Sequence, residues 1–270
     1  MASKVSRNYL ITGGGRGIGR GLSRSLLQKG HKVFLIDINQ DELDHFANQL
    51  AQTYTRGKAF DATVCNLRKL DELKAAVEGA SKLFAGHLDV LVNNAAYTGA
   101  VGAANAANIS LDQWNASVET NLTAPLFLSQ FCIPLLQKSS SRTVGGSIIH
   151  MSSTRAFMSE PDNEGYSATK AGLLGLTNAM SVSLAPQGIR VNAILPGWIN
   201  VTNESKQADE SGQSWEDGLS KDDHQWHLTG RVGKVEDILN AVEYLAESEF
   251  VSGSEMIVDG GVTRKMVYPE

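Results

Sequence analysis

The chain has 270 residues, with 24 Lys and Arg against 29 Asp and Glu, which gives a formal net charge of −5. This charge argues against electrostatic binding to nucleic acid, and a composition that is 42% hydrophobic and 20% charged excludes a mainly disordered chain. Glycine accounts for 26 residues, about 10% against a usual 7%. The sequence therefore predicts many tight backbone turns.

Several features predict a cytoplasmic protein with no membrane association. Residues 1–15 contain no long apolar run of the kind that forms a signal peptide. The most apolar stretch, 122–136, is shorter than the roughly 20 residues that a bilayer requires and is interrupted by polar residues and prolines. Cys65 and Cys132 lack the spacing of a disulfide framework, so we interpret both as small core residues.

Short aliphatic or β-branched runs alternate along the chain with amphipathic stretches. The runs are apolar almost throughout, which is typical of parallel strands buried on both faces. They are Tyr9–Ile11, Val33–Ile36, Ala59–Val64, Val90–Val92, Ser147–Met151, Arg190–Ile194 and Glu255–Val258. Apolar residues at helical spacing fill Gly19–Lys29, Leu43–Gln52, Leu70–Phe84, Leu111–Leu136, Tyr166–Leu184 and Val235–Ala246. We predict an α/β fold, a doubly wound, parallel, seven-stranded sheet of Rossmann type in a single domain spanning residues 1–270.

Residues 200–223 interrupt this alternation. They include seven acidic residues, two lysines and almost no aliphatic residue, so we expect them to lie outside the core. Three of the four tryptophans, Trp198, Trp215 and Trp226, nevertheless lie in or beside this segment. A solvated insertion would not need them. We therefore predict a substrate lid at about 198–230 that closes apolar faces over a site.

A glycine-rich turn follows the first predicted strand. Residues 12–19 read TGGGRGIG and lead into a helical stretch. Glycine lets the backbone approach an anion closely, and a helix N-terminus offers free N–H donors, so a pyrophosphate would fit here. The spacing departs from GxGxxG, since Ile18 stands where the third glycine would fall when counted from Gly13 and Gly15. From the glycines alone, phosphate binding and a merely tight turn remain alternatives.

An acidic residue at the end of the second strand favours a dinucleotide. Asp37 lies 18 residues beyond Gly19, close to the roughly 20 expected for the carboxylate that holds an adenosine ribose. Such a carboxylate would repel a 2′-phosphate, so the sequence favours NAD over NADP. Arg16 is the counter-argument, because its charge would suit a 2′-phosphate.

Tyr166 and Lys170 form a candidate pair for acid–base catalysis. At i and i+4 of a predicted helix they lie on one face, and a nearby ammonium lowers the pKa of a phenol from its usual value of about 10. Taken alone, such a pair is usually a chance match.

The order of motifs across residues 7–262 resembles the short-chain dehydrogenase/reductase family. The matching features are Thr12-Gly13-x-x-x-Gly17-Ile18-Gly19, Asn93-Asn94-Ala95, Asn121, Ser153 placed 13 residues before Tyr166, Tyr166-x-x-x-Lys170, Pro196-Gly197 and Val258-Asp259-Gly260-Gly261. The resemblance implies four catalytic residues. Tyr166 exchanges a proton with the substrate oxygen, Ser153 hydrogen-bonds that oxygen, Lys170 holds the nicotinamide ribose and lowers the tyrosine pKa, and Asn121 positions a water.

The resemblance also implies the residues that contact the cofactor. They are Gly13, Arg16, Gly17, Ile18, Gly19, Asp37, Asn66, Asn93, Ala95, Tyr166, Lys170, Pro196, Gly197 and Ile199. Three positions depart from the family pattern. Ala96 replaces a glycine near the nicotinamide ribose, Asn66 stands where many members have an aspartate against adenine, and Thr202 is one place late for the usual threonine.

These observations predict an NAD-dependent oxidoreductase that interconverts a secondary alcohol and a ketone. The small-molecule substrate is expected to be a sugar, polyol or hydroxylated ketone, with polar side chains at Arg155, Glu160, Asn163, Glu164 and His227 as candidates to face it. The alternatives are an NADP-dependent carbonyl or 3-oxoacyl reductase and a non-catalytic dinucleotide-binding regulatory protein.

Two further expectations concern metals and assembly. No metal site is predicted, because His224 and His227, beside two aspartates, lack the ordered ligands of a closed zinc site. A homotetramer is predicted, because the helices over 111–136 and 166–184 have apolar residues on more than one face.

Overall fold

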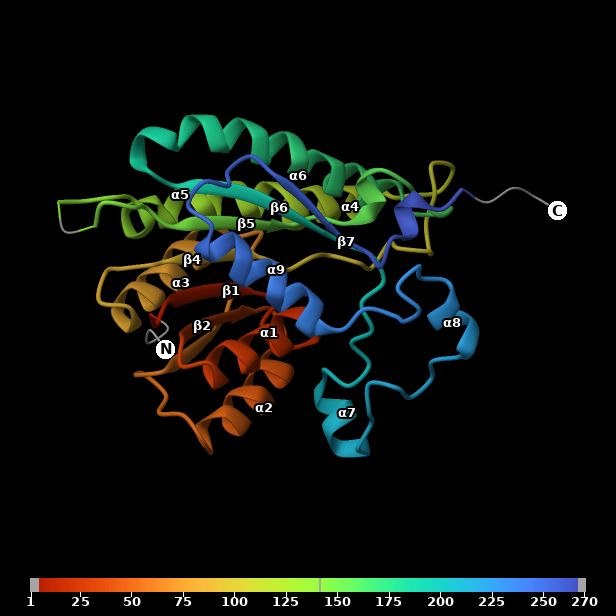
Figure 1. The fold of residues 1–270 in the computed structure, drawn as a ribbon, viewed down its shortest axis with the longest axis horizontal. Coiled ribbons are helices and arrows are strands. Elements are labelled where there is room, and N and C mark those ends of the chain that lie inside the picture. The colour runs from red at the N-terminus through yellow and green to blue at the C-terminus, as the bar shows by residue number, and fades with distance from the viewer. Residues whose placement is uncertain (1–4, 141, 267–270) are drawn as a thin grey trace.

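One parallel sheet of seven strands forms the centre of the computed structural model, which describes residues 5–140 and 142–266 (Figure 1). Its strand order is β3-β2-β1-β4-β5-β6-β7. The strands are β1 (Asn8–Thr12), β2 (Lys32–Asp37), β3 (Phe60–Val64), β4 (Val90–Asn93), β5 (Ser147–Met151), β6 (Arg190–Pro196) and β7 (Glu255–Val258). The order reverses between β1 and β4, and ligands of doubly wound sheets bind beyond the carboxyl ends of the strands at such a point. The predicted fold class is confirmed.

Two layers of helices cover the sheet. One face carries α1 (Gly17–Gln28), α2 (Gln40–Ala51) and α9 (Val235–Glu247), and the other carries α3 (Leu70–Leu83), α5 (Ala124–Leu136) and α6 (Glu164–Ser183), with α4 (Leu111–Val118) packed beside α6. A π-helical turn, Glu119–Thr123, joins α4 to α5 without a break. Short 3₁₀ turns span Thr154–Ala156, Ala185–Gln187 and Val262–Arg264. Burial on both faces explains why the central strands are apolar throughout.

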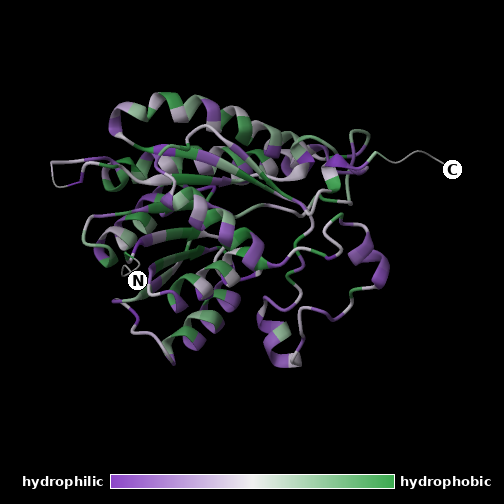
Figure 2. Cartoon of the chain, in the orientation of Figure 1, coloured by the Kyte–Doolittle hydropathy of each residue, from purple (hydrophilic) through white to green (hydrophobic). Residues whose placement is uncertain are grey.

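The segment after β6 lies outside this sandwich. It holds two short helices, α7 (Lys206–Ser211) and α8 (Lys221–Gln225), and Figure 2 shows that it is largely hydrophilic. The prediction that residues 200–223 lie outside the core is wrong at Asn200, Glu204 and Ala208, which are only 4%, 4% and 1% exposed. Glu204 pairs with arginines of α1, and α7 packs against α2, so part of the segment belongs to the packed body.

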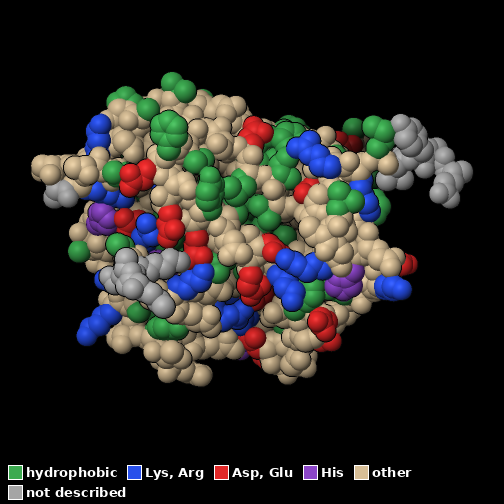
Figure 3. Space-filling model, viewed as in Figure 1, with side chains coloured by type: hydrophobic (Ala, Val, Ile, Leu, Met, Phe, Trp, Pro, Cys, Tyr) green, Lys and Arg blue, Asp and Glu red, His purple; other side chains and the backbone are tan. Residues whose placement is uncertain are grey.

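Charges of both signs mix on the face drawn in Figure 3, where acidic and basic side chains are interspersed over the lower half of the molecule. In the described part of the chain, no helix has the combined length and apolarity needed to cross a bilayer.

Candidate active site

A cavity of about 600 Å³ lies beyond the carboxyl ends of the strands on both sides of the reversal. Its lining residues come from the glycine turn, the segments after β4, β5 and β6, helix α6, the segment before α9 and the C-terminal turn. They include Ile18, Asn94, Ala96, Ser153, Arg155, Met158, Glu160, Tyr166, Lys170, Pro196, Gly197, Trp198, Ile199, Trp226, His227 and Val262. Three of the four predicted catalytic side chains, Ser153, Tyr166 and Lys170, therefore share one cavity.

Backbone hydrogen bonds fix the polar heads of this group. Ser153 follows β5, and its Oγ accepts a hydrogen bond of 3.1 Å from the Arg155 N–H, which leaves the serine hydroxyl hydrogen available for another acceptor. Lys170 is 2% exposed and donates from Nζ to the Met151 carbonyl at 2.7 Å. Its Nζ lies 5.3 Å from the centre of the Tyr166 ring. The arrangement places a hydroxyl, a phenol and an ammonium around one point.

Burial dominates the electrostatics of the tyrosine and the lysine. It raises the pKa of Tyr166, while the Arg155 charge and a hydrogen bond with Ser153 act in the lowering direction. Burial also lowers the pKa of Lys170 to about 8. The sequence singled out Lys170 as the cation that lowers the tyrosine pKa, whereas Arg155 is the cation that does so in this structure.

Asn121 lies behind the cavity rather than in its wall. It belongs to the π-helical turn and is fully buried. Its Oδ1 accepts from the Tyr97 N–H at 2.6 Å, and its Nδ2 donates to the Thr169 hydroxyl at 3.2 Å. The side chain thus ties the segment after β4 to α6, next to Lys170.

Replacing Lys170 with Met is expected to remove activity without lowering stability. A pKa of about 8 against 10.5 means that burying the ammonium costs about 3 kcal/mol at pH 7. The Met variant avoids this cost, and the hydrogen bond that it loses to the Met151 carbonyl cancels only part of the gain. Lys170→Met should therefore match or exceed the wild-type free energy of unfolding at pH 7.

The sign of the pH dependence tests this account of Lys170. Between pH 8 and 10.5 the native lysine is deprotonated while the unfolded one still binds its proton, so wild-type stability rises with pH and the Lys170→Met variant lacks this rise. Urea unfolding at pH 7 and pH 10 measures the gap between the two proteins, which should shrink. A variant less stable by more than about 1 kcal/mol at pH 7, or a gap independent of pH, would contradict the prediction.

The glycine turn fits an anionic group. A Cβ on Gly19 would lie 2.1 Å from the Gly13 carbonyl oxygen, and Gly13 and Gly17 have φ angles of +67° and +61°. Gly17 donates its N–H to the Glu204 carbonyl at 2.8 Å. The N–H groups of Ile18 and Gly19 have no hydrogen-bond partner among the described residues. These two donors, at the N-terminus of α1, suit a dinucleotide pyrophosphate.

Asp37 is held rigidly at the end of β2. Its Oδ2 accepts from the Gly15 N–H and its Oδ1 from the Asn39 N–H, both at 2.9 Å, and the residue is 8% exposed. Asp37 is therefore a preorganised carboxylate beside the glycine turn.

The turn after β4 is also fixed by a side chain, because the Thr12 hydroxyl oxygen accepts from the N–H groups of Asn94 and Ala95 at 3.0 Å each.

Several predicted contact residues do not face the cavity. Asn93 does not line the cavity, because its side chain points into the interior, where its Nδ2 donates to the Ser129 hydroxyl at 3.2 Å and lies 3.2 Å from His150 Nδ1. Asn94 faces the cavity instead and donates to the Thr12 carbonyl. Thr202 is exposed and does not line the cavity.

Two residues that are predicted to contact the cofactor lie at the rim of the sheet. Arg16, the N-cap of α1, is exposed and makes no ion pair with any described residue. Asn66 follows β3, and its Oδ1 accepts from the Arg68 N–H at 3.1 Å. In contrast, Pro196, Gly197 and Ile199 line the cavity directly.

The polar residues predicted to face a substrate divide into two groups. Arg155, Glu160 and His227 line the cavity. Asn163 and Glu164 do not, because Asn163 donates to the Pro161 carbonyl and Glu164 accepts from the Ala106 N–H at 2.9 Å.

Two of the three tryptophans in the predicted lid line the cavity and one does not. Trp198 and Trp226 line the cavity, whereas Trp215 packs outside it, with Lys234 Nζ 4.1 Å from the centre of its ring. Met158 and Val262 line the cavity although the sequence analysis did not single them out. Val262 directly follows the Val258–Gly261 motif, which was an available signal.

The two histidines beside Asp222 and Asp223 form hydrogen bonds with backbone groups of the chain. His227 Nδ1 donates to the Asp223 carbonyl at 3.0 Å, and His224 Nδ1 accepts from the Val232 N–H at 3.3 Å. No cluster of three or more His, Cys, Asp or Glu side chains with metal-binding geometry occurs in residues 5–140 and 142–266.

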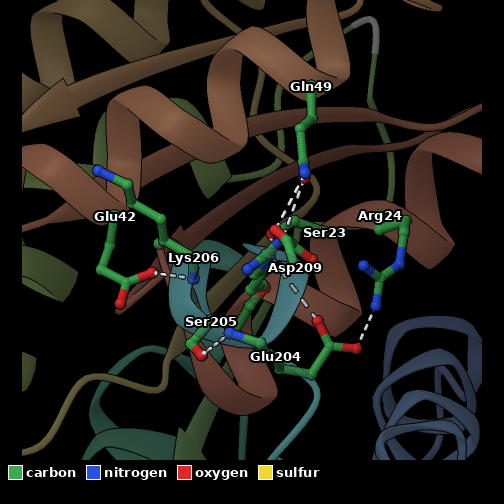
Figure 4. Close-up of polar contacts among 12 residues, drawn as sticks. Ser23, Arg24, Glu42, Gln49, Glu204, Ser205, Lys206 and Asp209 are labelled. Carbon is green, nitrogen blue, oxygen red and sulfur yellow. Dashed lines mark hydrogen bonds and ion pairs between the residues drawn. The ribbon is translucent and has the colours of Figure 1, made fainter. Parts of the chain in front are cut away.

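Residues 200–211 belong to the first half of the predicted lid and are termed the lid arm. The lid arm forms ion pairs and hydrogen bonds with side chains of α1 and α2 (Figure 4). Glu204 forms ion pairs with Arg20 and Arg24, and Asp209 forms an ion pair with Arg20 and accepts from Gln49 at 2.9 Å. Arg20 is fully buried on α1. The lid arm therefore packs against the helix that begins at the glycine turn.

Glu204→Gln is expected to lower the free energy of unfolding by about 2 kcal/mol. Removing one partner of a buried ion pair usually costs about 3–5 kcal/mol, and the loss is smaller here because Arg20 keeps Asp209. Glu247→Gln, which removes the exposed pair with Arg7, is the matched control and should cost less than about 1 kcal/mol. Equal effects of the two variants in urea unfolding would refute a structural role for the Glu204 charge.

The fold and the cavity together point to a class of protein, the dinucleotide-binding oxidoreductases built on a doubly wound sheet. Comparisons with known proteins agree. A family model described as enoyl-(acyl carrier protein) reductase matches residues 13–263. An uncharacterized oxidoreductase of Thermotoga maritima is 36% identical over 266 residues, 97% of each chain. The 3-oxoacyl-[acyl-carrier-protein] reductase FabG of the same organism is 32% identical over 255 residues, 94% of this chain and 96% of the relative.

A solved structure shows the same architecture. An apo SCOR enzyme from Clostridium thermocellum superimposes with a TM-score of 0.81 at 33% identity, covering 98% of this chain and 96% of its own. The chain belongs to the short-chain dehydrogenase/reductase family, whose members bind a nicotinamide dinucleotide.

Proposed function

We propose that this protein is an NAD-dependent oxidoreductase that interconverts a secondary alcohol and a ketone. The observation that carries the proposal is the meeting of Ser153, Tyr166 and Lys170 in one cavity that Pro196 and Gly197 also line. When bound, the nicotinamide supplies or accepts the hydride, and the protein supplies orientation and proton transfer.

Each catalytic candidate has a role that its contacts support. The Tyr166 hydroxyl exchanges a proton with the substrate oxygen. Ser153 donates a hydrogen bond to that oxygen, since the hydrogen bond from the Arg155 N–H engages its oxygen and leaves the hydroxyl hydrogen free to donate. Lys170 holds the nicotinamide ribose, and Asn121 orders the segment beside it through Tyr97 and Thr169.

The cofactor is proposed to bind along the edge of the sheet from Asp37 to Lys170. The glycine turn, Gly13 to Gly19, holds the pyrophosphate through the free N–H groups of Ile18 and Gly19. Asp37 accepts hydrogen bonds from the adenosine ribose and Asn66 contacts adenine. Ala95, Pro196, Gly197 and Ile199 flank the nicotinamide end.

Residues 198–230 are proposed to act as the substrate lid. Its first half is anchored to α1 and α2, while its second half contributes Trp226 and His227 to the cavity wall. The polar side chains of Arg155, Glu160 and His227 support a polar substrate.

An NADP-dependent 3-oxoacyl or carbonyl reductase is the second candidate. The identity to FabG favours it, as does the exposed guanidinium of Arg16, which pairs with no carboxylate among the described residues. A non-catalytic regulatory protein is disfavoured, because such a protein has no need to keep Ser153, Tyr166 and Lys170 together at one cavity.

A dehydrogenase screen separates these candidates. Sugars, polyols, hydroxy acids and cyclic alcohols are offered with NAD and with NADP, and reduced cofactor is followed by its absorbance. We expect turnover of at least one polar secondary alcohol with NAD. Activity only with NADP supports the reductase, and the absence of turnover with either cofactor supports the regulatory protein.

Assembly as a cytoplasmic homotetramer completes the proposal. Apolar side chains remain exposed on the helices named for subunit contact, with Leu111 of α4 72% exposed, Leu126 of α5 40% and Val182 of α6 76%. Burial of these side chains against a second copy would remove apolar surface from water.

A further inference from the structure

The cavity wall carries an excess of positive charge close to the reacting group. Two cations, Arg155 and Lys170, line it, and Glu160 is the one carboxylate among the lining residues that the structure describes. The Arg155 guanidinium carbon lies 5.9 Å from the centre of the Tyr166 ring. A negatively charged substrate group would be attracted to this place.

The backbone of Arg155 is fixed relative to the reaction centre. The residue belongs to the 3₁₀ turn Thr154–Ala156, two positions after Ser153, and its N–H donates to the Ser153 hydroxyl oxygen. Its guanidinium, 5.9 Å from the centre of the Tyr166 ring, therefore lies beside the place where a substrate oxygen would meet Ser153 and Tyr166. Its planar donor fork matches a carboxylate in a bidentate geometry.

The present partner of Arg155 is weakly held. Glu160 forms an ion pair with Arg155, yet its side chain is 69% exposed, against 31% for Arg155. Water screens a pair of this exposure, so it contributes little to stability. A substrate anion can therefore replace Glu160 at small cost.

We propose that the substrate carries a carboxylate near its reacting carbon and that Arg155 binds this carboxylate. The substrate class is then a hydroxy acid and the corresponding oxo acid. This inference rests on the proposed function and narrows its polar substrate to an acidic one.

Matched probes test the inference by binding. Pyruvate, acetoacetate and 4-oxopentanoate, each paired with its methyl ester, are titrated into the wild-type complex with NAD, which has no hydride to give them. The change in tryptophan fluorescence is recorded at pH 7, since Trp198 and Trp226 line the cavity. Reduction of the same probes is followed in a separate assay with NADH. At least one acid should bind about tenfold to a hundredfold more tightly than its ester. In Arg155→Gln this acid-to-ester ratio should fall toward one.

Two further variants separate charge from shape. Arg155→Lys keeps the charge and should retain part of the ratio, while Glu160→Gln removes the competing carboxylate and should increase it. The inference is overturned if every acid binds no better than its ester, if neither member of any pair binds, or if the ratio survives in Arg155→Gln.

Turnover of the same probes tests the proposed function separately. Acid binding that depends on Arg155 without reduction of any probe supports the carboxylate site and counts against the oxidoreductase assignment. Reduction of the ketones without an acid preference supports the oxidoreductase and overturns the carboxylate site.

Discussion

Tyr166→Phe is expected to lower kcat/KM by about 10²–10⁴-fold, the range typical of a general acid–base group. The substitution removes only the phenolic oxygen and keeps the ring, which packs in the cavity between Arg155 and Lys170. Cofactor affinity and thermal stability should therefore remain close to wild type. Steady-state kinetics with any substrate found in the screen provides the measurement.

The control for this variant is Tyr244→Phe. Tyr244 lies on α9, 49% exposed and outside the cavity, so its variant should keep wild-type kinetics. Undiminished turnover in Tyr166→Phe with normal cofactor binding would remove the basis for the assigned mechanism.

The pH profile gives a second reading of the same residue. Burial raises the Tyr166 pKa and the Arg155 charge opposes this effect, so loss of that charge raises the pKa further. Alcohol oxidation needs the phenolate as base. The rise of oxidation rate with pH should therefore occur at higher pH in Arg155→Gln than in wild type.

Wild-type enzyme is expected to prefer NAD over NADP by about 30-fold in kcat/KM. At about 4 Å and an effective dielectric of 20, a carboxylate and a phosphate charge repel by roughly 4 kcal/mol, and even half of that energy corresponds to this ratio. The two backbone hydrogen bonds to Asp37 prevent it from turning away from the ribose.

Asp37→Asn is the sharpest variant for this prediction. It removes the charge while keeping an oxygen that can accept from Gly15 or Asn39, so the preference should fall below about threefold with little change in fold. Arg16→Ala should weaken whatever NADP use remains. Equal use of the two cofactors by the wild type, or a preference for NADP, would show that Arg16 outweighs Asp37.

The sheet was predictable from sequence for a simple physical reason. Strands covered by helices on both faces must be apolar along their length, and each predicted run coincides with an observed strand to within two residues at either end. The helix predicted over 111–136 exists as one continuous stretch, but its π-helical turn at Glu119–Thr123 has no signal in the spacing of apolar residues.

The site was predictable where a residue's role follows from its position on an element. Tyr166 and Lys170 face the cavity because they lie one turn apart on α6. Asn93 and Asn94 are adjacent in sequence, yet they point in opposite directions, and only the Ser129 hydroxyl far along the chain explains which one faces inward.

Long-range charge pairing was the main feature hidden from the sequence. Glu204 is buried because Arg20 and Arg24, about 180 residues earlier, neutralise it. The acidic, polar composition of residues 200–223 predicts that their side chains are exposed, and it contains no signal for pairing with arginines so far away in the sequence.

A crystal structure of the protein with NAD tests the central claim most directly, since the claim is that one continuous site runs from Asp37 to Tyr166. The adenosine ribose is predicted to contact Asp37, the pyrophosphate to accept from the N–H groups of Ile18 and Gly19, and the nicotinamide to lie in the cavity beside Tyr166 and Lys170. A dinucleotide bound away from Asp37, or a nicotinamide out of reach of Tyr166, would contradict the account.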